Sequence, residues 1–474
     1  MAKQSARFVC QSCGAAFAKW SGRCEGCGEW NSIVEEVSRA TAAPGGLGKG
    51  GGRGRPQPLA MVSLSGASEP PPRLVCGIAE FDRVAGGGLV PGSAVLIGGD
   101  PGVGKSTLLL QVAAKLARQG LPTLYVTGEE AVDQIRMRAG RMHLADAPVG
   151  LAAATAVRDI AAALDGPHLP AVVIIDSVQT LWLDTLESAP GTVSQVRGAA
   201  QELIRLAKAR GFVLLLVGHV TKEGVIAGPK VLEHMVDCVI SFEGERGHPF
   251  RILRATKNRF GATDEIGVFE MGELGLAEVA NPSALFLAER QGEVPGSAVF
   301  AGLEGTRPIL VEIQALVAGQ PPGTPRRAVV GWDSGRLAMV LAVLETRCGL
   351  SLAGRDVYLN VAGGLRIGEP AADLAVAAAL ISAASGRPVP AGTVVFGEIG
   401  LSGEVRAVSR PELRLKEAQK LGFKTALAPK GRTEAKVSAA GQTMVEIASV
   451  GDLLSHLAVS AARAGSRPLA MERG

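Results

Sequence analysis

Short apolar runs alternate with segments of helical periodicity through the middle of the chain. Runs of strand length and high apolar content lie at 93–97, 122–127, 171–176, 211–219 and 250–256. The segment 108–116, close behind the first run, carries apolar residues at helical spacing. Because strands that alternate with helices form parallel sheets covered on both faces, this pattern predicts an α/β fold.

Two other stretches break this alternation. Residues 38–60 are rich in glycine, proline and basic side chains without apolar periodicity, which predicts a flexible linker. From about residue 283 the pattern changes to an apolar helix opening in 366–376, two short strands in 394–406, a helix at 412–421 and a strand at 425–429. We therefore expect five regions: 1–37, the linker 38–60, an α/β domain at 61–282, an α+β domain at 283–460 and a disordered tail at 461–474.

The length, charge and hydropathy of the chain limit the classes of protein to which it can belong. At 474 residues the chain is too long for one core, so two or three domains are expected. The formal net charge of +4 permits an anionic partner without requiring one. No run approaches the roughly eighteen apolar residues of a membrane span, and the N-terminus lacks a signal-peptide pattern. We expect a cytoplasmic protein with no membrane contact and no disulfides.

Four of the seven cysteines form two C-x-x-C pairs: Cys10, Cys13, Cys24 and Cys27. Each pair can supply two thiolates from one tight turn, and four thiolates suit tetrahedral zinc. So small a module cannot bury a sufficient core, and the metal would supply its folding free energy, on the order of 10 kcal/mol. A redox dithiol is the alternative. We expect four aromatic side chains to pack on this small core: Phe8, Phe17, Trp20 and Trp30.

A phosphate-binding pattern, G-x-x-x-x-G-K-[ST], lies between the first predicted strand and the first predicted helix. Its glycines allow a tight turn whose N–H groups converge on an anion at the helix N-terminus. In this interpretation Lys105 reaches the β- and γ-phosphates of ATP and Ser106 ligates magnesium. A chance match in a glycine-rich turn is the alternative. The predicted cradle comprises Gly99, Asp100, Pro101, Gly102, Val103, Gly104, Lys105, Ser106 and Thr107.

Acidic residues follow two further predicted strands. Glu129 and Glu130 come after 122–127, where a carboxylate can orient or deprotonate the water that attacks the γ-phosphate. Alternatively, both acids merely begin the next helix, where they favour its dipole. Asp176 ends the run at 171–176 and is placed to hold magnesium through water, while Ser177 is expected to cap the turn.

The segment 81–92 contains three consecutive glycines at 86–88 and ends at Gly92, and it resembles the approach to the phosphate loop in RecA-like ATPases. The resemblance implies that the catalytic glutamate is Glu129, with Glu130 second. It also implies that the polar residue His219, at the end of 211–219, senses the γ-phosphate and reports to a DNA-contacting loop; a structural histidine is the alternative. The candidates for this loop are residues 183–197 and residues 221–232. The second is preferred, because Lys222 and Lys230 could bind the phosphates of single-stranded DNA.

The strand predicted at 250–256 runs into Lys257, Asn258, Arg259, Phe260 and Gly261. Residues two apart on extended backbone point the same way, so Lys257 and Arg259 form a pair. In hexameric RecA-like motors such a K-x-R pair reaches the neighbour's nucleotide as an arginine finger. A solvated basic turn is the alternative. The pentapeptide also resembles the signature of the bacterial RadA (Sms) recombination-repair family.

The C-terminal region contains G-E-I-x-L-x-G-x-V at 397–405, which resembles the proteolytic domain of Lon proteases. Those enzymes use a serine–lysine pair. Here Ala371 stands at the serine position and, by ungapped counting, Glu412 at the lysine position. Without a serine or lysine no acyl-enzyme forms by that route, so we expect an inactive scaffold for oligomerisation or DNA contact.

The resemblance to the RadA family covers nearly the whole chain, in the order zinc finger, linker, RecA-like ATPase and Lon-like domain. It implies a DNA-dependent ATPase using ATP, magnesium and zinc. It further implies partners, namely single-stranded and branched DNA and RecA, with branch migration carried out by a ring of six. The alternatives are an ATP-dependent Lon-like protease, a RecA-like signalling ATPase without DNA translocation, and a non-enzymatic zinc adaptor.

Overall fold

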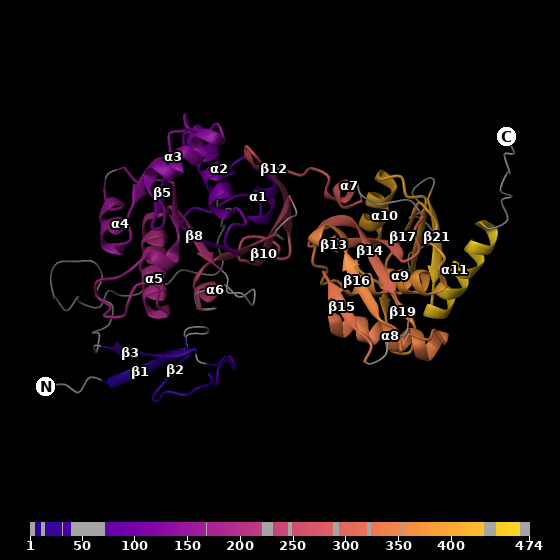
Figure 1. Ribbon diagram of the computed structural model, residues 1–474. Coiled ribbons are helices and arrows are strands. Elements are labelled where there is room, and N and C mark those ends of the chain that lie inside the picture. Colours follow the sequence, from indigo (N-terminus) through magenta and orange to yellow (C-terminus); the bar gives the residue numbers. More distant parts are fainter. Residues whose placement is uncertain are drawn as a thin grey trace, which may run out of the picture. The chain divides into compact units, whose positions relative to one another are not determined.

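The computed structural model describes residues 5–10, 15–30, 32–38, 72–166, 168–219, 231–244, 249–287, 293–319, 324–352, 354–430 and 442–464. The chain divides into two compact units (Figure 1). One unit comprises 1–243 and 253–278, and the other comprises 244–252 and 279–474.

The N-terminal strands β1 (Ser5–Cys10), β2 (Ala16–Phe17) and β3 (Ile33–Ser38) form a small antiparallel sheet in the order β2-β1-β3. Its core consists of Cys10, Cys24 and Ile33, against which Phe8 and Phe17 pack. The expectation that Trp20 and Trp30 join this core is wrong, because their exposed fractions are 59% and 67%. The Trp20 indole N–H instead donates to the Ile33 carbonyl at 3.0 Å, and the Arg23 guanidinium lies over the Trp30 ring.

A nine-stranded sheet forms the centre of the first unit, in the order β12-β11-β10-β9-β4-β8-β7-β5-β6. Neighbouring strands from β9 to β6 in this order are parallel, as the alternating sequence pattern predicts. The strands are β4 (Ala94–Gly99), β5 (Thr123–Thr127), β6 (Gly150–Ala153), β7 (Val172–Asp176), β8 (Val213–His219), β9 (Cys238–Glu243), β10 (Phe250–Asn258), β11 (Ile266–Gly272) and β12 (Gly275–Glu278).

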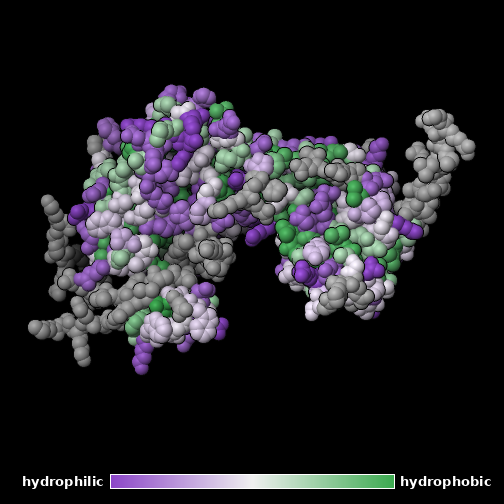
Figure 2. Space-filling model, in the orientation of Figure 1, coloured by the Kyte–Doolittle hydropathy of each residue, from purple (hydrophilic) through white to green (hydrophobic). Residues whose placement is uncertain are grey.

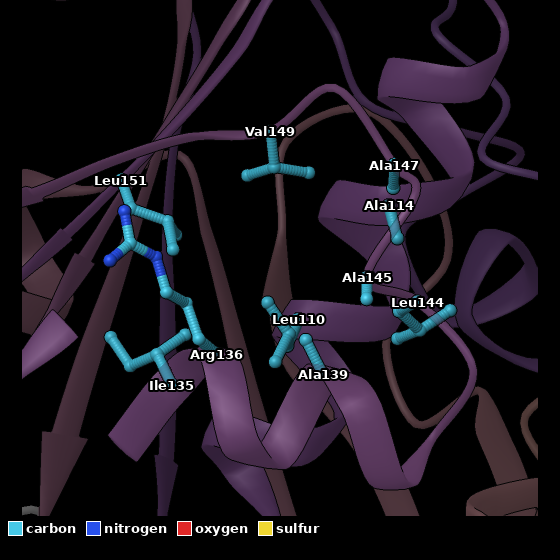
Figure 3. Close-up of a pocket in the computed structure, with 10 residues that line it drawn as sticks. All are labelled: Leu110, Ala114, Ile135, Arg136, Ala139, Leu144, Ala145, Ala147, Val149 and Leu151. Atoms are coloured by element: carbon cyan, nitrogen blue, oxygen red, sulfur yellow. The ribbon is translucent and has the colours of Figure 1, made fainter. Parts of the chain in front are cut away.

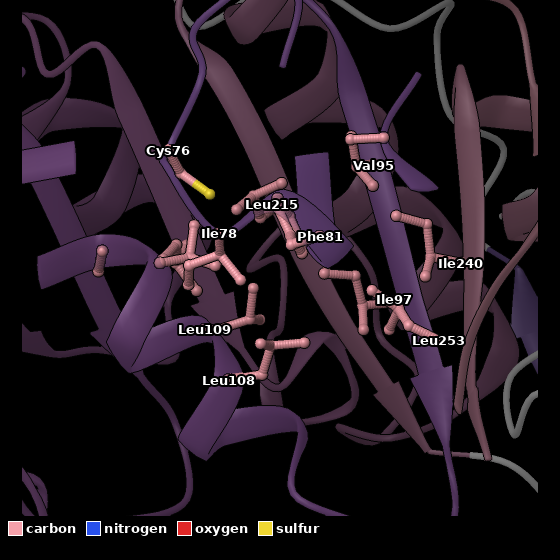
Figure 4. Close-up of a cluster of buried hydrophobic side chains, with 14 of the residues drawn as sticks. Cys76, Ile78, Phe81, Val95, Ile97, Leu108, Leu109, Leu215, Ile240 and Leu253 are labelled. Carbon is pink, nitrogen blue, oxygen red and sulfur yellow. The ribbon is translucent and has the colours of Figure 1, made fainter. Parts of the chain in front are cut away.

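Alternate residues of each central strand enter two separate cores, one on each face of the sheet. Val95 and Ile97 of β4 pack with α1 and α2 (Figure 4), whereas Ala94 and Leu96 pack with α4 and α5. This period of two explains why the strands are apolar throughout. The helices are α1 (Ala79–Val84), α2 (Lys105–Arg118), α3 (Val132–Arg141), α4 (Val157–Ala163), α5 (Val193–Arg210) and α6 (Val231–Met235), with a 3₁₀ turn, η1 (Val178–Thr180).

The second unit is built on a seven-stranded mixed sheet in the order β15-β16-β14-β13-β17-β20-β21. The strands are β13 (Ser297–Glu304), β14 (Arg307–Val317), β15 (Arg327–Val330), β16 (Val357–Val361), β17 (Thr393–Val395), β20 (Thr425–Pro429) and β21 (Thr443–Ile447), with a separate hairpin of β18 (Glu398–Ile399) and β19 (Val405–Arg406). The helices are α7 (Pro282–Phe286), α8 (Ser334–Cys348), α9 (Asp373–Ser385), α10 (Pro411–Lys420) and α11 (Val450–Ala464), with 3₁₀ turns η2 (Ala362–Gly364) and η3 (Pro370–Ala372).

Helix α9 lies at the core of this second unit. All residues from Asp373 to Ser382 are buried, as expected of a helix that is apolar on every side. Its buried Asp373 is neutralised by Arg336 of α8, whose Nε lies 2.9 Å from Oδ1. On the face shown in Figure 2, hydrophilic residues cover the region over α3, while hydrophobic and hydrophilic patches are mixed on the second unit. Among the described residues, no helix has the length and apolar character of a membrane span.

Candidate functional site

The loop between β4 and α2 has the backbone that a phosphate cradle needs. Gly102 and Gly104 have φ values of +83° and +114°, which side chains other than glycine rarely adopt. At Gly99 a Cβ atom would lie 2.4 Å from the Phe242 carbonyl oxygen, so only glycine fits there. Because α2 begins at Lys105, its first N–H groups lie at this loop, where they can bind an anion.

Lys105 is almost fully buried, with an exposed fraction of 4%. Its Nζ donates to two loop carbonyls, Gly99 O at 2.7 Å and Asp100 O at 3.0 Å. Burial lowers the pKa of Lys105, against the opposing effect of nearby carboxylates, chiefly Asp176. The ammonium therefore has neutral hydrogen-bond partners that a phosphate could replace.

Asp176 ends β7, and its register partner in the neighbouring strand β5 is Thr127. The carboxylate is buried, and its Oδ2 accepts a hydrogen bond of 2.5 Å from the Tyr125 hydroxyl. Burial, and then the charge of Asp176, raise the pKa of Tyr125 well above its ordinary value, while the Ser106 side chain interacts with the same phenol. Ser106 and Asp176 thus offer hard oxygen ligands of the type that magnesium prefers.

Glu129 and Glu130 have different surroundings although they are adjacent in the sequence. Glu129 Oε1 accepts a hydrogen bond from Ser177 Oγ and lies 3.1 Å from His219 Nε2. Glu130 instead forms an ion pair with Arg138 of α3, with an N–O distance of 2.6 Å. Of the two, Glu129 is the one whose carboxylate contacts the residues at the ends of β7 and β8, Ser177 and His219.

The pKa of Glu129 reflects this setting. Burial by itself would raise that pKa, but hydrogen bonds from Ser177 and His219 and the charges of His219 and Lys105 outweigh it. The net effect holds the pKa of Glu129 below its ordinary value. Glu129 is therefore a carboxylate at neutral pH, as a group that polarises water must be.

The sequence predicts that Ser177 caps the turn after β7, and this prediction is wrong. The Ser177 side chain makes no capping hydrogen bond, because its hydroxyl donates to Glu129. The turn is instead stabilised by Thr180, whose Oγ1 donates to the Ser177 carbonyl at 2.8 Å. Sequence reasoning missed this role of Ser177. The signal was a hydroxyl residue directly after the acid that ends a buried strand.

His219 ends β8, and its register partner is Gly99, the first residue of the phosphate pattern. Its Nε2 contacts Glu129, while its Nδ1 is buried and has no hydrogen-bond partner among the residues described. His219 thus joins Glu129 to the strand adjacent to β4. The residues that follow it, 220–230, and with them Lys222 and Lys230, lie outside the described residues.

The segment 257–261 points its side chains in two directions. Lys257 Nζ donates to the carbonyls of Glu233 and Val236 at 2.6 and 2.8 Å, and Arg259 forms a 3.0 Å ion pair with Asp237. Burial, and then the charge of Arg259, lower the pKa of Lys257. The two cations therefore share one side, as their spacing predicts.

The remaining members of this segment pack on the glycine-rich turn after α1. Asn258 Nδ2 donates to Val84 O at 3.4 Å, and the Phe260 carbonyl accepts a 2.6 Å hydrogen bond from Arg73. A Cβ atom on Gly261 would lie 2.8 Å from the Gly86 Cα, so the backbones approach as closely as glycine allows. Asn258 and Gly261 thus fix the position from which Lys257 and Arg259 project.

The cation pair and the phosphate loop lie at opposite ends of the sheet. Asp237, the partner of Arg259, exchanges backbone and side-chain hydrogen bonds with Ala94, the first residue of β4. The phosphate loop instead follows Gly99, the last residue of β4. At about 3.3 Å per residue, the two ends are roughly 17 Å apart. Lys257 and Arg259 are therefore too far from the phosphate loop of their own chain to reach a nucleotide bound there.

A pocket of about 400 Å³ lies between α2 and α3 (Figure 3). Its walls are largely apolar and include Leu110, Ala114, Ile135, Ala139 and Leu144, with Arg136 at one side. No residue of the phosphate loop lines it. This pocket is therefore separate from the place where a triphosphate would bind.

Three of the four paired cysteines come together in the N-terminal sheet. The sulfur atoms of Cys10, Cys24 and Cys27 lie within 4.8 Å of one another, while Cys13 lies outside the described residues. Ser32 Oγ is 3.2 Å from Cys10 Sγ and could hydrogen-bond a thiolate there. Clustered thiols of this kind suit zinc.

The Lon-like positions in the second unit carry no nucleophile. Ala371 is buried in η3, and Glu412 is exposed in the first turn of α10. Nearby, the fully buried Arg414 pairs with the partly exposed Glu369, and Arg414 Nη1 lies 3.0 Å from Glu369 Oε2. The same guanidinium donates to Ala301 O at 2.8 Å and lies over the Phe396 ring. The described contacts of this pair are all with other residues of the second unit, so the pair stabilises that fold.

Family models match three parts of the chain. An AAA domain matches residues 73–225, a rubredoxin metal binding domain matches 8–35, and the subunit ChlI of Mg-chelatase matches 334–432. With the geometry above, these matches define a RecA-like P-loop ATPase that hydrolyses ATP and carries an N-terminal zinc ribbon and a ChlI/Lon-like C-terminal domain.

Curated relatives then identify the family. The DNA repair protein RadA of Brucella abortus (strain 2308) is 58% identical over 469 residues, covering 98% of this chain and 99% of the relative. That of Rickettsia felis is 52% identical, covering 89% of this chain and 93% of the relative. The chain belongs to the DNA repair protein RadA family. Among solved structures, the RadB recombinase is 19% identical with a TM-score of 0.36, covering 44% of this chain and 99% of its own.

Proposed function

We propose that this protein is a DNA-dependent ATPase that moves along single-stranded DNA. In doing so it promotes branch migration of the strand-exchange products that RecA makes, and it works as a ring of six subunits. The name shared by its relatives, DNA repair protein RadA, supports a role on DNA. The main observation behind the proposal is that the phosphate loop and the pair Lys257 and Arg259 lie at opposite ends of the sheet.

Within one subunit, Gly99 to Thr107 would hold the triphosphate of ATP. Lys105 would exchange its two carbonyl partners for phosphate oxygens, and Ser106 and Asp176 would hold a magnesium ion that neutralises phosphate charge. Glu129 would orient and polarise the attacking water, because Ser177 and His219 keep it ionised and fixed in direction. Glu130, which pairs with Arg138, would be the second candidate for this role.

Completion of the site would come from the neighbouring subunit. Lys257 and Arg259 cannot reach the triphosphate of their own chain, yet they stand together on one side of β10. Arginine fingers supplied in this way contribute about 10³- to 10⁵-fold to rate in related phosphoryl-transfer sites. A closed ring would give each site one such pair, which is why we favour a hexamer over an open pair of subunits.

DNA would contact the segment that follows His219. Lys222 and Lys230 supply phosphate-binding charge there, and His219 links the segment to Glu129, so hydrolysis and DNA contact are joined. At its other end the segment leads into α6, whose Glu233 carbonyl holds Lys257. The C-terminal unit would act as a scaffold for oligomerisation or DNA contact, since Ala371 and Glu412 supply no serine–lysine pair.

The test measures ATP hydrolysis with and without single-stranded and branched DNA, beside the molecular mass by light scattering. We expect stimulation by DNA, a mass of six chains and branch migration that Lys105→Ala and Lys257→Ala both abolish. Mixing these two variants should restore part of the ATPase activity, because each mixed interface can join an intact loop to an intact pair. Absence of DNA stimulation would favour a signalling ATPase, and degradation of casein would favour a protease.

A further inference from the structure

Asp237, between α6 and β9, is a buried carboxylate that the sequence motifs do not assign. Its exposed fraction is 4%, and each of its oxygens has a partner. Oδ1 accepts from Arg259 Nη1 at 3.0 Å and lies 3.5 Å from Lys208 Nζ, and Oδ2 accepts from the Ala94 backbone N–H at 3.1 Å. Asp237 therefore ties the end of β10 to the start of β4 and to α5.

The contact with Arg259 fixes that side chain but leaves most of its donors available. The Arg259 backbone N–H donates to the Asp237 carbonyl at 3.0 Å, so main chain and side chain are held at the same residue. The Arg259 side chain is nevertheless 54% exposed. A guanidinium has five N–H donors, and the ones beyond Nη1 suffice for a bidentate bond to a phosphate.

We propose that Asp237 is the positioning residue of the arginine finger: it holds the Arg259 guanidinium in the orientation that meets the triphosphate of a neighbouring subunit. The inference rests on the proposed function, in which Arg259 acts in trans. Its physical basis is preorganisation, because a free arginine at an exposed strand end samples many rotamers, whereas one anchored at Nη1 retains few. Lys257 is anchored independently, through the carbonyls of Glu233 and Val236.

The test uses Asp237→Asn in the full-length chain, with Arg259→Ala for comparison. Asparagine keeps the size of the side chain and one acceptor oxygen but loses the charge that holds the guanidinium. We expect kcat for DNA-stimulated hydrolysis to fall about 100-fold, the typical cost of a misplaced catalytic group. Binding of a fluorescent ATP analogue to the variant's own phosphate loop should stay within about twofold, because that loop is untouched.

Subunit mixing separates positioning from stability. Asp237→Asn mixed with Lys105→Ala should regain activity, as the proposed function predicts for Lys257→Ala, whereas Asp237→Asn mixed with Arg259→Ala should not. The double variant Asp237→Asn/Arg259→Ala should be no slower than Arg259→Ala alone. Lys208→Met is the matched control, since it removes the other cation on Asp237 and leaves Arg259 in place; it should keep at least about half of the wild-type kcat.

The outcomes distinguish this inference from the proposed function. If Arg259→Ala keeps its full kcat, the proposal that Arg259 acts as an arginine finger is wrong. If Arg259→Ala is inactive but Asp237→Asn keeps full kcat, only the positioning role is overturned. Weakened analogue binding and a lowered unfolding temperature in Asp237→Asn, without rescue on mixing, would likewise overturn it, because they would show that Asp237 supports β4 rather than Arg259.

Discussion

Each unit of the protein contains a deeply buried cation, and the two have opposite kinds of partner. Among the described residues, Lys105 of the ATPase unit bonds only to backbone carbonyls, whereas Arg414 of the C-terminal unit is fully buried and bonds to the carboxylate of Glu369. A buried charge is tolerated only when it is compensated. Arg414 has a carboxylate bonded to it within the fold. Lys105 has carboxylates nearby, chiefly Asp176, but its direct hydrogen bonds go to carbonyls that an incoming anion can replace.

The comparison teaches how to separate a binding site from a structural ion pair. Both cations lie in the first turn of a helix and both are hidden from water, so burial alone does not distinguish them. The distinguishing feature is the hydrogen-bonded partner. A carbonyl can be exchanged for a phosphate at little cost, but a paired carboxylate cannot be displaced without leaving a buried charge.

The largest expected effect is on Lys105. Lys105→Ala should lower the rate of ATP hydrolysis by at least about 10³-fold, because it removes a charged donor from the developing charge on the phosphates. The unfolding temperature should hardly change, since the lysine has no carboxylate bonded to it in the fold. Hydrolysis assays and thermal melts check both parts, and a large loss of stability would contradict the contrast with Arg414.

The two glutamates give the next effect. Glu129→Gln should slow hydrolysis about 10²-fold or more, the usual range for a lost general base, with ATP binding retained. Glu130→Gln is the matched control, because the Glu130 carboxylate is paired with Arg138 whereas the Ser177 hydroxyl bonds to Glu129. Equal losses in both variants would show that the positions act through the fold of the loop rather than through chemistry.

A third prediction concerns Arg414. Arg414→Ala should destabilise the C-terminal unit by up to about 3–5 kcal/mol, because Glu369, whose side chain is only 19% exposed, would lose its charged partner. Replacing both residues with apolar side chains of similar size should restore much of the stability. Denaturant titration of the single and double variants measures the difference, and an unchanged midpoint in Arg414→Ala would show that water reaches Glu369 freely.

The smallest expected effect is a shift in the pH profile. The hydrogen bond from Ser177 helps to hold the pKa of Glu129 below its ordinary value. Activity that needs the Glu129 carboxylate is therefore present above that pKa and lost as pH falls through it. Ser177→Ala should raise the pKa and move the acid limb of kcat toward higher pH, with little change at about pH 8. An acid limb that stays in place would remove Ser177 from the site.

Local spacing alone determined the phosphate loop, the cysteine module, the α/β order and the helix and strands near 394–429. These features depend on residues a few positions apart, where a glycine permits a positive φ or two cysteines share one turn. The absence of a serine–lysine pair at Ala371 and Glu412 was equally visible, because it is a matter of residue identity.

Tertiary structure decided which residues meet. The sequence ranked Glu129 above Glu130, but only the order of β5, β7 and β8 in the sheet brings Ser177 and His219 to Glu129. Contacts between distant segments likewise decide that Trp20 and Trp30 are exposed and that Arg259 forms an ion pair with Asp237. The physical reason is that hydrophobic periodicity specifies the face of an element, whereas its neighbours follow from how the whole sheet packs.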